Sequence, residues 1–115
     1  MRADLGRYFE GYLLETTNLM KTIYDAAIGA GKDVQVRIDG RELVFGKGDA
    51  GRGFLRMIPS EATVVIAFPN GSQLLDKQKR LRGYPGAQSK MTLAHASDVD
   101  IYVRRLIDAA YALES

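Results

Sequence analysis

The sequence predicts an α+β fold: an antiparallel β-meander of about four to five strands, with an N-terminal and a C-terminal helix packed on one face. Three observations predict it. Apolar residues recur at three- and four-residue steps near both ends of the chain, they alternate with polar residues in the middle, and glycine-rich turns separate the alternating segments. The order of helix, strands and helix lacks the β-α-β alternation of a doubly wound fold.

The first helix is expected within residues 4–29, where apolar side chains line one helical face. Gly11 is a weak point in this pattern, so either one helix or a short helix followed by a longer one fits the sequence. Gly29 supplies a stop signal at the C-terminal end.

Five segments are expected to be strands. Alternation of apolar and polar residues is typical of a strand with one buried face. Asp39-Gly40 indicates a hairpin turn between the first two strands. The fourth segment, TVVIAF, is nearly all apolar and β-branched, so it is placed centrally in the sheet. The segments are 34–38, 42–45, 54–58, 63–68 and 91–95.

The final helix has the clearest pattern. Ser97 is expected to cap its N-terminus, and Asp100 follows at the spacing of a capping box. One apolar stripe is expected to face the sheet. Its members are Val99, Tyr102, Val103, Leu106, Ala110 and Leu113.

Length and composition limit the classes of function. A chain of 115 residues is expected to form one domain, 1–115. It has no cysteine, which excludes disulfides, thiol nucleophiles and thiolate metal sites, and its single histidine, His95, excludes the usual zinc sites. A carboxylate-only magnesium or calcium site stays open, but no cofactor is expected and no metal ligand is assigned. The longest apolar runs are far shorter than the ~20 residues of a membrane span, and the first residues do not resemble a signal peptide, so a cytoplasmic location is expected.

A glycine-rich loop matches a nucleotide-binding pattern in its residue types but not in its expected structural context. Gly46 to Gly51 reads G-x-G-x-x-G. In a dinucleotide-binding fold these glycines open a helix whose N-terminus holds the pyrophosphate. Here the loop leads into another strand, so it is expected to be a structural hairpin loop.

A local cluster of cations is the main candidate binding site. Net charge is only +2, from 16 basic and 14 acidic residues, so the whole chain does not indicate nucleic acid. Residues 76–84, however, carry four cations, one carboxylate and a tyrosine that would stack on a base. Solvated surface is the alternative interpretation. The candidate residues for an anion or other partner are Lys77, Lys79, Arg80, Arg82, Tyr84 and Lys90.

His95 is the other residue with chemical potential. A lone histidine can act as a general base, but no nucleophile motif accompanies it, so a packed or capping role is favoured. Asp98 and Asp100 fit capping better than metal binding. No catalytic residue is therefore assigned.

Six segments carry a family resemblance: residues 23–27, 31–34, 41–45, 54–59, 97–100 and 106–111. They resemble a small bacterial and archaeal domain of unknown function, which also forms the C-terminal part of longer proteins called predicted transport proteins. Similar small domains have been labelled iron chaperones, which would imply clustered carboxylates that this sequence does not show. The resemblance implies the same fold and assigns no catalytic residue.

These observations favour a non-enzymatic interaction or ligand-binding module, while leaving catalysis open. The first alternative is nucleic-acid or anion binding through the basic loop 77–90, and the second is a small enzyme that uses His95. Self-association as a homodimer is also considered, because helices on one face leave the other face of the sheet to be covered. No membrane partner is expected.

Overall fold

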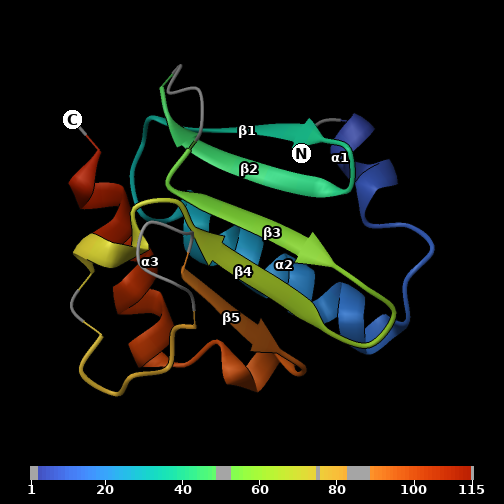
Figure 1. The fold of residues 1–115 in the computed structure, drawn as a ribbon. Helices are drawn as coiled ribbons and strands as arrows, with labels where there is room; N and C mark the ends of the chain where they lie inside the picture. The colour runs from blue at the N-terminus through green and yellow to red at the C-terminus, as the bar shows by residue number, and fades with distance from the viewer. Residues whose placement is uncertain (1–2, 49–52, 75, 83–88, 115) are drawn as a thin grey trace.

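The computed structural model describes residues 3–48, 53–74, 76–82 and 89–114. It confirms the α+β fold, with five antiparallel strands in one sheet in the order β1-β2-β3-β4-β5 (Figure 1). Each strand pairs with its neighbour in sequence, so the sheet is a meander. The strands are β1 (Val34–Asp39), β2 (Glu42–Lys47), β3 (Leu55–Pro59), β4 (Val64–Phe68) and β5 (Ser89–Leu93).

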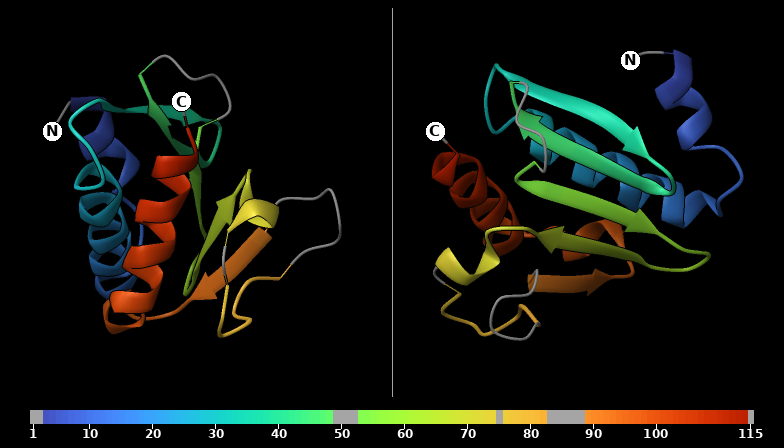
Figure 2. Two further views of the ribbon diagram at one scale, coloured as in Figure 1. Left: turned by 90° about the vertical axis from the view of Figure 1, so that its left-hand side faces the viewer. Right: turned by 45° about the horizontal axis from the view of Figure 1, so that its top comes forward.

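The helices lie on one face of the sheet, as Figure 2 shows edge-on. They are α1 (Ala3–Tyr8), α2 (Leu14–Ile28) and α3 (Ile101–Leu113), and two 3-10 turns are η1 (Gly71–Gln73) and η2 (Ala96–Asp98). No helix in the described part of the chain is long and apolar enough to cross a membrane.

The core lies between this sheet face and the helices. Cross-strand partners on that face are buried together, for example Phe45 beside Leu55 and Met57 beside Ile66. Each such side chain contributes about 1.5–3 kcal/mol by leaving water. β4 lies inside the sheet, as its apolar sequence predicts, although β3 is the central strand.

The N-terminal region forms a short helix followed by a longer one. The break is at Gly11, whose φ of +87° suits glycine. Phe9, directly after α1, packs edge-on against Tyr24 of α2 with ring centroids 6.1 Å apart. The predicted stop is also confirmed, because α2 ends at Ile28 with Gly29 as its C-cap.

The predicted cap of the last helix is wrong. Asp100, not Ser97, is the N-cap of α3, and its Oδ1 accepts a hydrogen bond from the Val103 N–H at 3.0 Å. Ser97 lies in η2, a separate turn in which Asp98 accepts the backbone N–H groups of Ala94 and His95. Ser97 and Asp100 belong to two successive elements, so their three-residue spacing is not a capping box.

The buried stripe of α3 also differs from the prediction. Ile107 is fully buried although the predicted stripe omits it, whereas Leu113 is 39% exposed. Ile107 lies four residues after Val103 and three before Ala110, so it belongs to the same helical face. Val103, Leu106 and Ala110 are buried as predicted.

The glycine-rich loop joins two strands, as predicted. β2 runs into it and β3 follows it, with no helix between them in the described residues. At its end, Gly53 has φ +77°, and a Cβ there would lie 2.6 Å from the Phe45 carbonyl oxygen and 2.7 Å from Val44 Cγ1. Only glycine fits so close an approach. Val44 alternates with core residues and lies on the sheet face away from the helices, yet it is 1% exposed. The chain thus covers part of that face itself.

Candidate functional site

A basic depression lies between residues 78–82 and strand β5. Its volume is about 680 Å³. It brings together four of the predicted residues, Lys79, Arg80, Arg82 and Lys90, along with Thr92 and Asp98. Lys77 is exposed and does not line the depression. Tyr84 lies outside the described residues. Most of the predicted cluster therefore lines one depression.

The carboxylate of Asp76 holds the 76–82 segment in place. It accepts the backbone N–H of Arg80 at 3.1 Å and that of Leu81 at 2.8 Å. It also accepts the hydroxyl of Tyr102, which itself accepts the Gln78 N–H at 3.0 Å. Burial acts to raise the pKa of Asp76, but these hydrogen bonds outweigh it and lower that pKa. The segment is thus fastened to the start of α3.

Arg80 is an anchor of this segment, because its charge is already matched. Its guanidinium lies 3.2 Å from a carboxylate oxygen of Asp100 and 5.0 Å from the centre of the Tyr102 ring. The pKa of Asp100 is lowered, first by the Val103 N–H and then by Arg80. Arg80 therefore shapes the wall of the depression, and less of its charge is available to a ligand.

Arg82 and Lys90 lie opposite one another at the outer edge of β5. Their backbones exchange two hydrogen bonds, Arg82 N–H to Lys90 O at 2.7 Å and Lys90 N–H to Arg82 O at 2.6 Å. Directly opposed residues in an antiparallel pair project their side chains to the same face, with Cβ atoms about 5 Å apart. Two positive side chains therefore stand side by side.

Lys79 adds a third cation from an unusual backbone conformation. Its φ is +53°, the only positive value among the described non-glycine residues. Such a conformation costs about 1–2 kcal/mol for an L-residue. The turn that contains Lys79 is held by the Asp76 carboxylate, which accepts hydrogen bonds from the backbone N–H groups of Arg80 and Leu81. The position of Lys79 at the depression is thus imposed by the fold.

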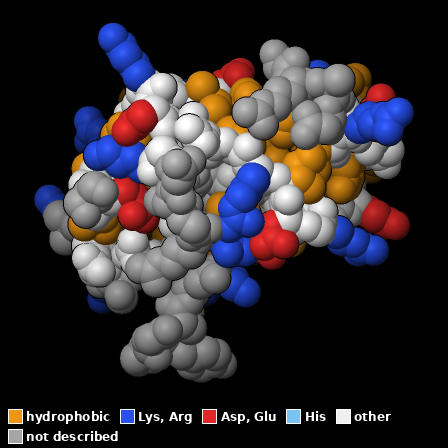
Figure 3. Space-filling model, turned by 90° about the horizontal axis from the view of Figure 1, so that it is seen from above, with side chains coloured by type: hydrophobic (Ala, Val, Ile, Leu, Met, Phe, Trp, Pro, Cys, Tyr) orange, Lys and Arg blue, Asp and Glu red, His pale blue; other side chains and the backbone are white. Residues whose placement is uncertain are grey.

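Lys79, Arg82 and Lys90 have no carboxylate partner in the described part of the chain. The ion pairs formed there involve Arg37, Arg56, Arg80 and His95 as the positive partners. The carboxylate that lines the depression, Asp98, is engaged by two backbone N–H groups at 2.9 Å, and the Ala94 N–H is the first cause of its lowered pKa. The depression is locally positive. By contrast, basic and acidic side chains are interspersed on the face drawn in Figure 3.

His95 lines neither the basic depression nor the cleft between residues 10–13, Arg41 and residues 59–61. Its side chain is 60% exposed and its Nδ1 contacts the Glu15 carboxylate. The hydrogen bond to Glu15 raises the pKa of His95. This placement gives the enzyme hypothesis no support, and that hypothesis stays a prediction.

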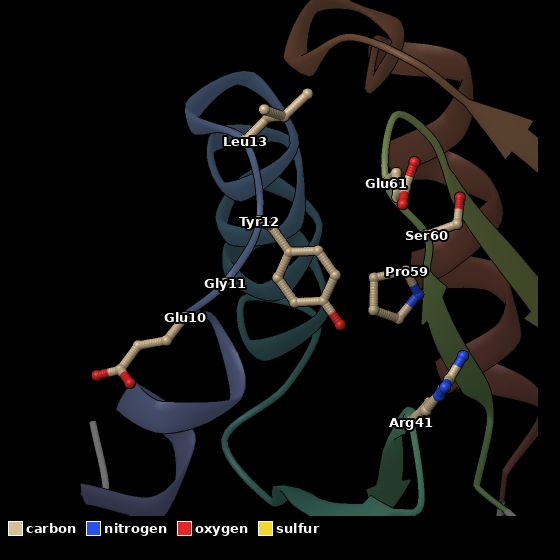
Figure 4. A pocket seen from close by; sticks show the side chains of 8 residues that line it. All are labelled: Glu10, Gly11, Tyr12, Leu13, Arg41, Pro59, Ser60 and Glu61. Atoms are coloured by element: carbon tan, nitrogen blue, oxygen red, sulfur yellow. The ribbon is translucent and has the colours of Figure 1, made fainter.

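The sequence did not indicate a second cleft, shown in Figure 4. It has a volume of about 690 Å³ and lies between residues 10–13, Arg41 of the β1–β2 turn and the β3–β4 turn at residues 59–61. Three separate segments form it and none carries a motif, so only the fold reveals it.

Comparisons with protein-family models, with curated proteins and with solved structures found no match. The resemblance to the small domain of unknown function therefore stays a prediction. Among the described residues, no group of three or more histidine, aspartate or glutamate side chains is placed to hold a metal ion.

Proposed function

We propose that this protein is a non-enzymatic module that binds an anionic ligand or partner in the depression beside β5. The observation that carries the proposal is the opposed pair Arg82 and Lys90, whose like charges have no carboxylate partner among the described residues. Like charges directly opposite in a sheet are destabilising. A site that keeps such a pair together is prepared for a negative ligand.

The magnitudes fit a binding role. Two unit charges about 6 Å apart in water repel by about 0.7 kcal/mol, which a folded chain tolerates easily. An anion that contacts both cations adds two attractions that outweigh this repulsion. Hydrogen bonds to charged groups contribute about 1.5–3 kcal/mol each. Lys79, which also lines the depression, adds a third contact. A ligand with several negative charges therefore fits best.

The proposal joins the leading hypothesis of a binding module to its first alternative of anion binding. Nucleic acid is one member of the anion class. A nucleic-acid site usually adds an aromatic ring on which bases stack. Here the Tyr102 ring is covered by Arg80, and Tyr84 is outside the described residues. The class of anion is therefore left to direct measurement.

The test is a titration of the whole protein at low salt against three probes: a fluorescent oligothymidylate, a fluorescent oligoglutamate peptide and inorganic pyrophosphate. We expect at least one of them to bind, with an affinity that falls as salt is added. For an oligonucleotide the logarithmic salt slope is about −0.7 per neutralised phosphate. If none of the three binds at low salt, the proposal is wrong.

A further inference from the structure

The second cleft has walls that are tied together before any ligand arrives. The Tyr8 hydroxyl, from α1, donates to the carbonyl oxygen of Arg41 at 2.7 Å. Thr16, from α2, is 2% exposed, and its hydroxyl donates to the carbonyl oxygen of Glu61 at 2.9 Å. Both bonds use backbone oxygens, so they position Arg41 and Glu61 while leaving their charged ends unused. A preformed site loses less entropy on binding.

Opposite charges face this cleft from two different turns. Arg41 and Glu61 both line the cleft, and Figure 4 shows them on the same wall as Pro59, whereas the side chain of Glu10 points away. Neither Arg41 nor Glu61 takes part in an ion pair with another described residue. Each charge is thus available to a ligand.

The strand register places the backbones that carry these two charges. Leu43 is opposite Met57, so the continued register places Arg41 opposite Pro59. Glu61 follows two residues later, beyond the end of β3, in the turn where the Ser60 N–H donates to the Thr63 carbonyl oxygen at 2.9 Å. A ligand that meets both charges therefore carries its own opposite charges at two separate ends.

An apolar surface lies between the two charges. Figure 4 shows the ring of Tyr12 pointing from the α1–α2 linker toward Pro59, between Arg41 and Glu61. Leu13 stands at the rim with 65% of its surface exposed. Large apolar side chains exposed beside a concave site are typical of ligand-binding surfaces.

We propose that this cleft binds a short peptide through both of its ends. Arg41 holds the terminal carboxylate, Glu61 holds the terminal ammonium, and the apolar side chains rest on Tyr12 and Pro59. A short peptide with free ends carries both opposite charges and an apolar body between them. This site is separate from the basic depression and does not depend on anion binding there.

The test uses three forms of one probe: leucyl-leucine, its N-acetyl derivative and its C-terminal amide. Acetylation removes the positive end, and amidation removes the negative end. Titrations of the whole protein followed by amide NMR are expected to shift resonances of residues 11–13 and 60–61. The free dipeptide is expected to bind about tenfold more tightly than either capped form, because each cap removes one charge-assisted contact.

Matched variants assign each end to its residue. Arg41→Gln is expected to remove the difference between the dipeptide and its amide, while the difference from the acetyl form remains. Glu61→Gln is expected to do the reverse. Both variants keep the backbone oxygens that tie the walls together. Arg105→Gln and Asp108→Asn, at exposed positions on α3, should leave all three affinities unchanged.

Equal affinity for all three probes, shifts confined to other residues, or no shifts at any probe concentration would overturn this proposal. So would a loss of affinity for the dipeptide that is the same in the control variants. None of these outcomes affects anion binding beside β5, which the oligonucleotide, oligoglutamate and pyrophosphate titrations test on their own.

Discussion

Arg82 and Lys90 exchange both backbone hydrogen bonds, at 2.7 and 2.6 Å, and so hold two positive side chains next to each other at the outer edge of β5. Because the bonds are made by the backbone, either side chain can be replaced without removing the bridge. The charge of the depression can therefore be altered separately from its shape.

The clamp between Asp76 and Tyr102 should stabilise the basic segment. Tyr102→Phe removes the hydroxyl that donates to Asp76 and accepts the Gln78 N–H. We expect a lower free energy of unfolding than in the unaltered protein and faster amide exchange at residues 78–81. Tyr24→Phe is the control, because the Tyr24 hydroxyl makes no hydrogen bond in the described structure. Equal effects of the two variants would show that the clamp contributes nothing.

Gly53 should tolerate no side chain. Gly53→Ala places a Cβ at a positive φ and 2.6 Å from a backbone oxygen, so we expect a loss of about 3 kcal/mol in the free energy of unfolding. Gly40→Ala is the matched control, since its φ is +63° but a Cβ there meets open space. That variant should lose only about 1–2 kcal/mol. Chemical denaturation of both variants measures the difference, and losses of the same size would rule out the close contact.

The pair of Glu15 and His95 should make stability depend on pH. The hydrogen bond to Glu15 raises the pKa of His95 above its ordinary value of about 6.5. Its contribution to stability is therefore complete below about pH 6.5 and is lost as pH rises through the higher folded-state pKa. We expect an NMR titration to show this raised pKa, and Glu15→Gln to return it toward 6.5. An unchanged His95 pKa in that variant would contradict the pairing.

The sequence predicts the strands well because this sheet is buried mainly on one face. Alternation marks β5, as between buried Met91 and Leu93 and exposed Thr92, whereas in β2 and β4 part of the second face is buried too and the apolar run itself indicates the strand. The cap of α3 is predicted less well, since Ser97, Asp98 and Asp100 all suit a cap in sequence. Only the backbone decides that Asp98 closes one turn and Asp100 begins the helix.

The candidate sites show a similar division. The run of cations was visible in the sequence and does line a depression. The sequence did not show that Arg80 is an anchor, because its partners Asp100 and Tyr102 lie about twenty residues away in the chain. The cleft between Arg41 and Glu61 has no sequence signal at all, since it depends on the strand register and on two hydrogen bonds from α1 and α2.

The most direct test of the central proposal compares two variants in one titration with whichever anionic probe binds best. Lys79→Ala, Arg82→Ala and Lys90→Ala combined remove the available charges of the depression, while Lys77→Ala removes a nearby cation that does not line it. We expect the triple variant to lose at least about tenfold in affinity and to show a flatter salt dependence, and Lys77→Ala to stay within about twofold of the unaltered protein. Unchanged affinity in the triple variant, or an equal loss in Lys77→Ala, would contradict anion binding at this site.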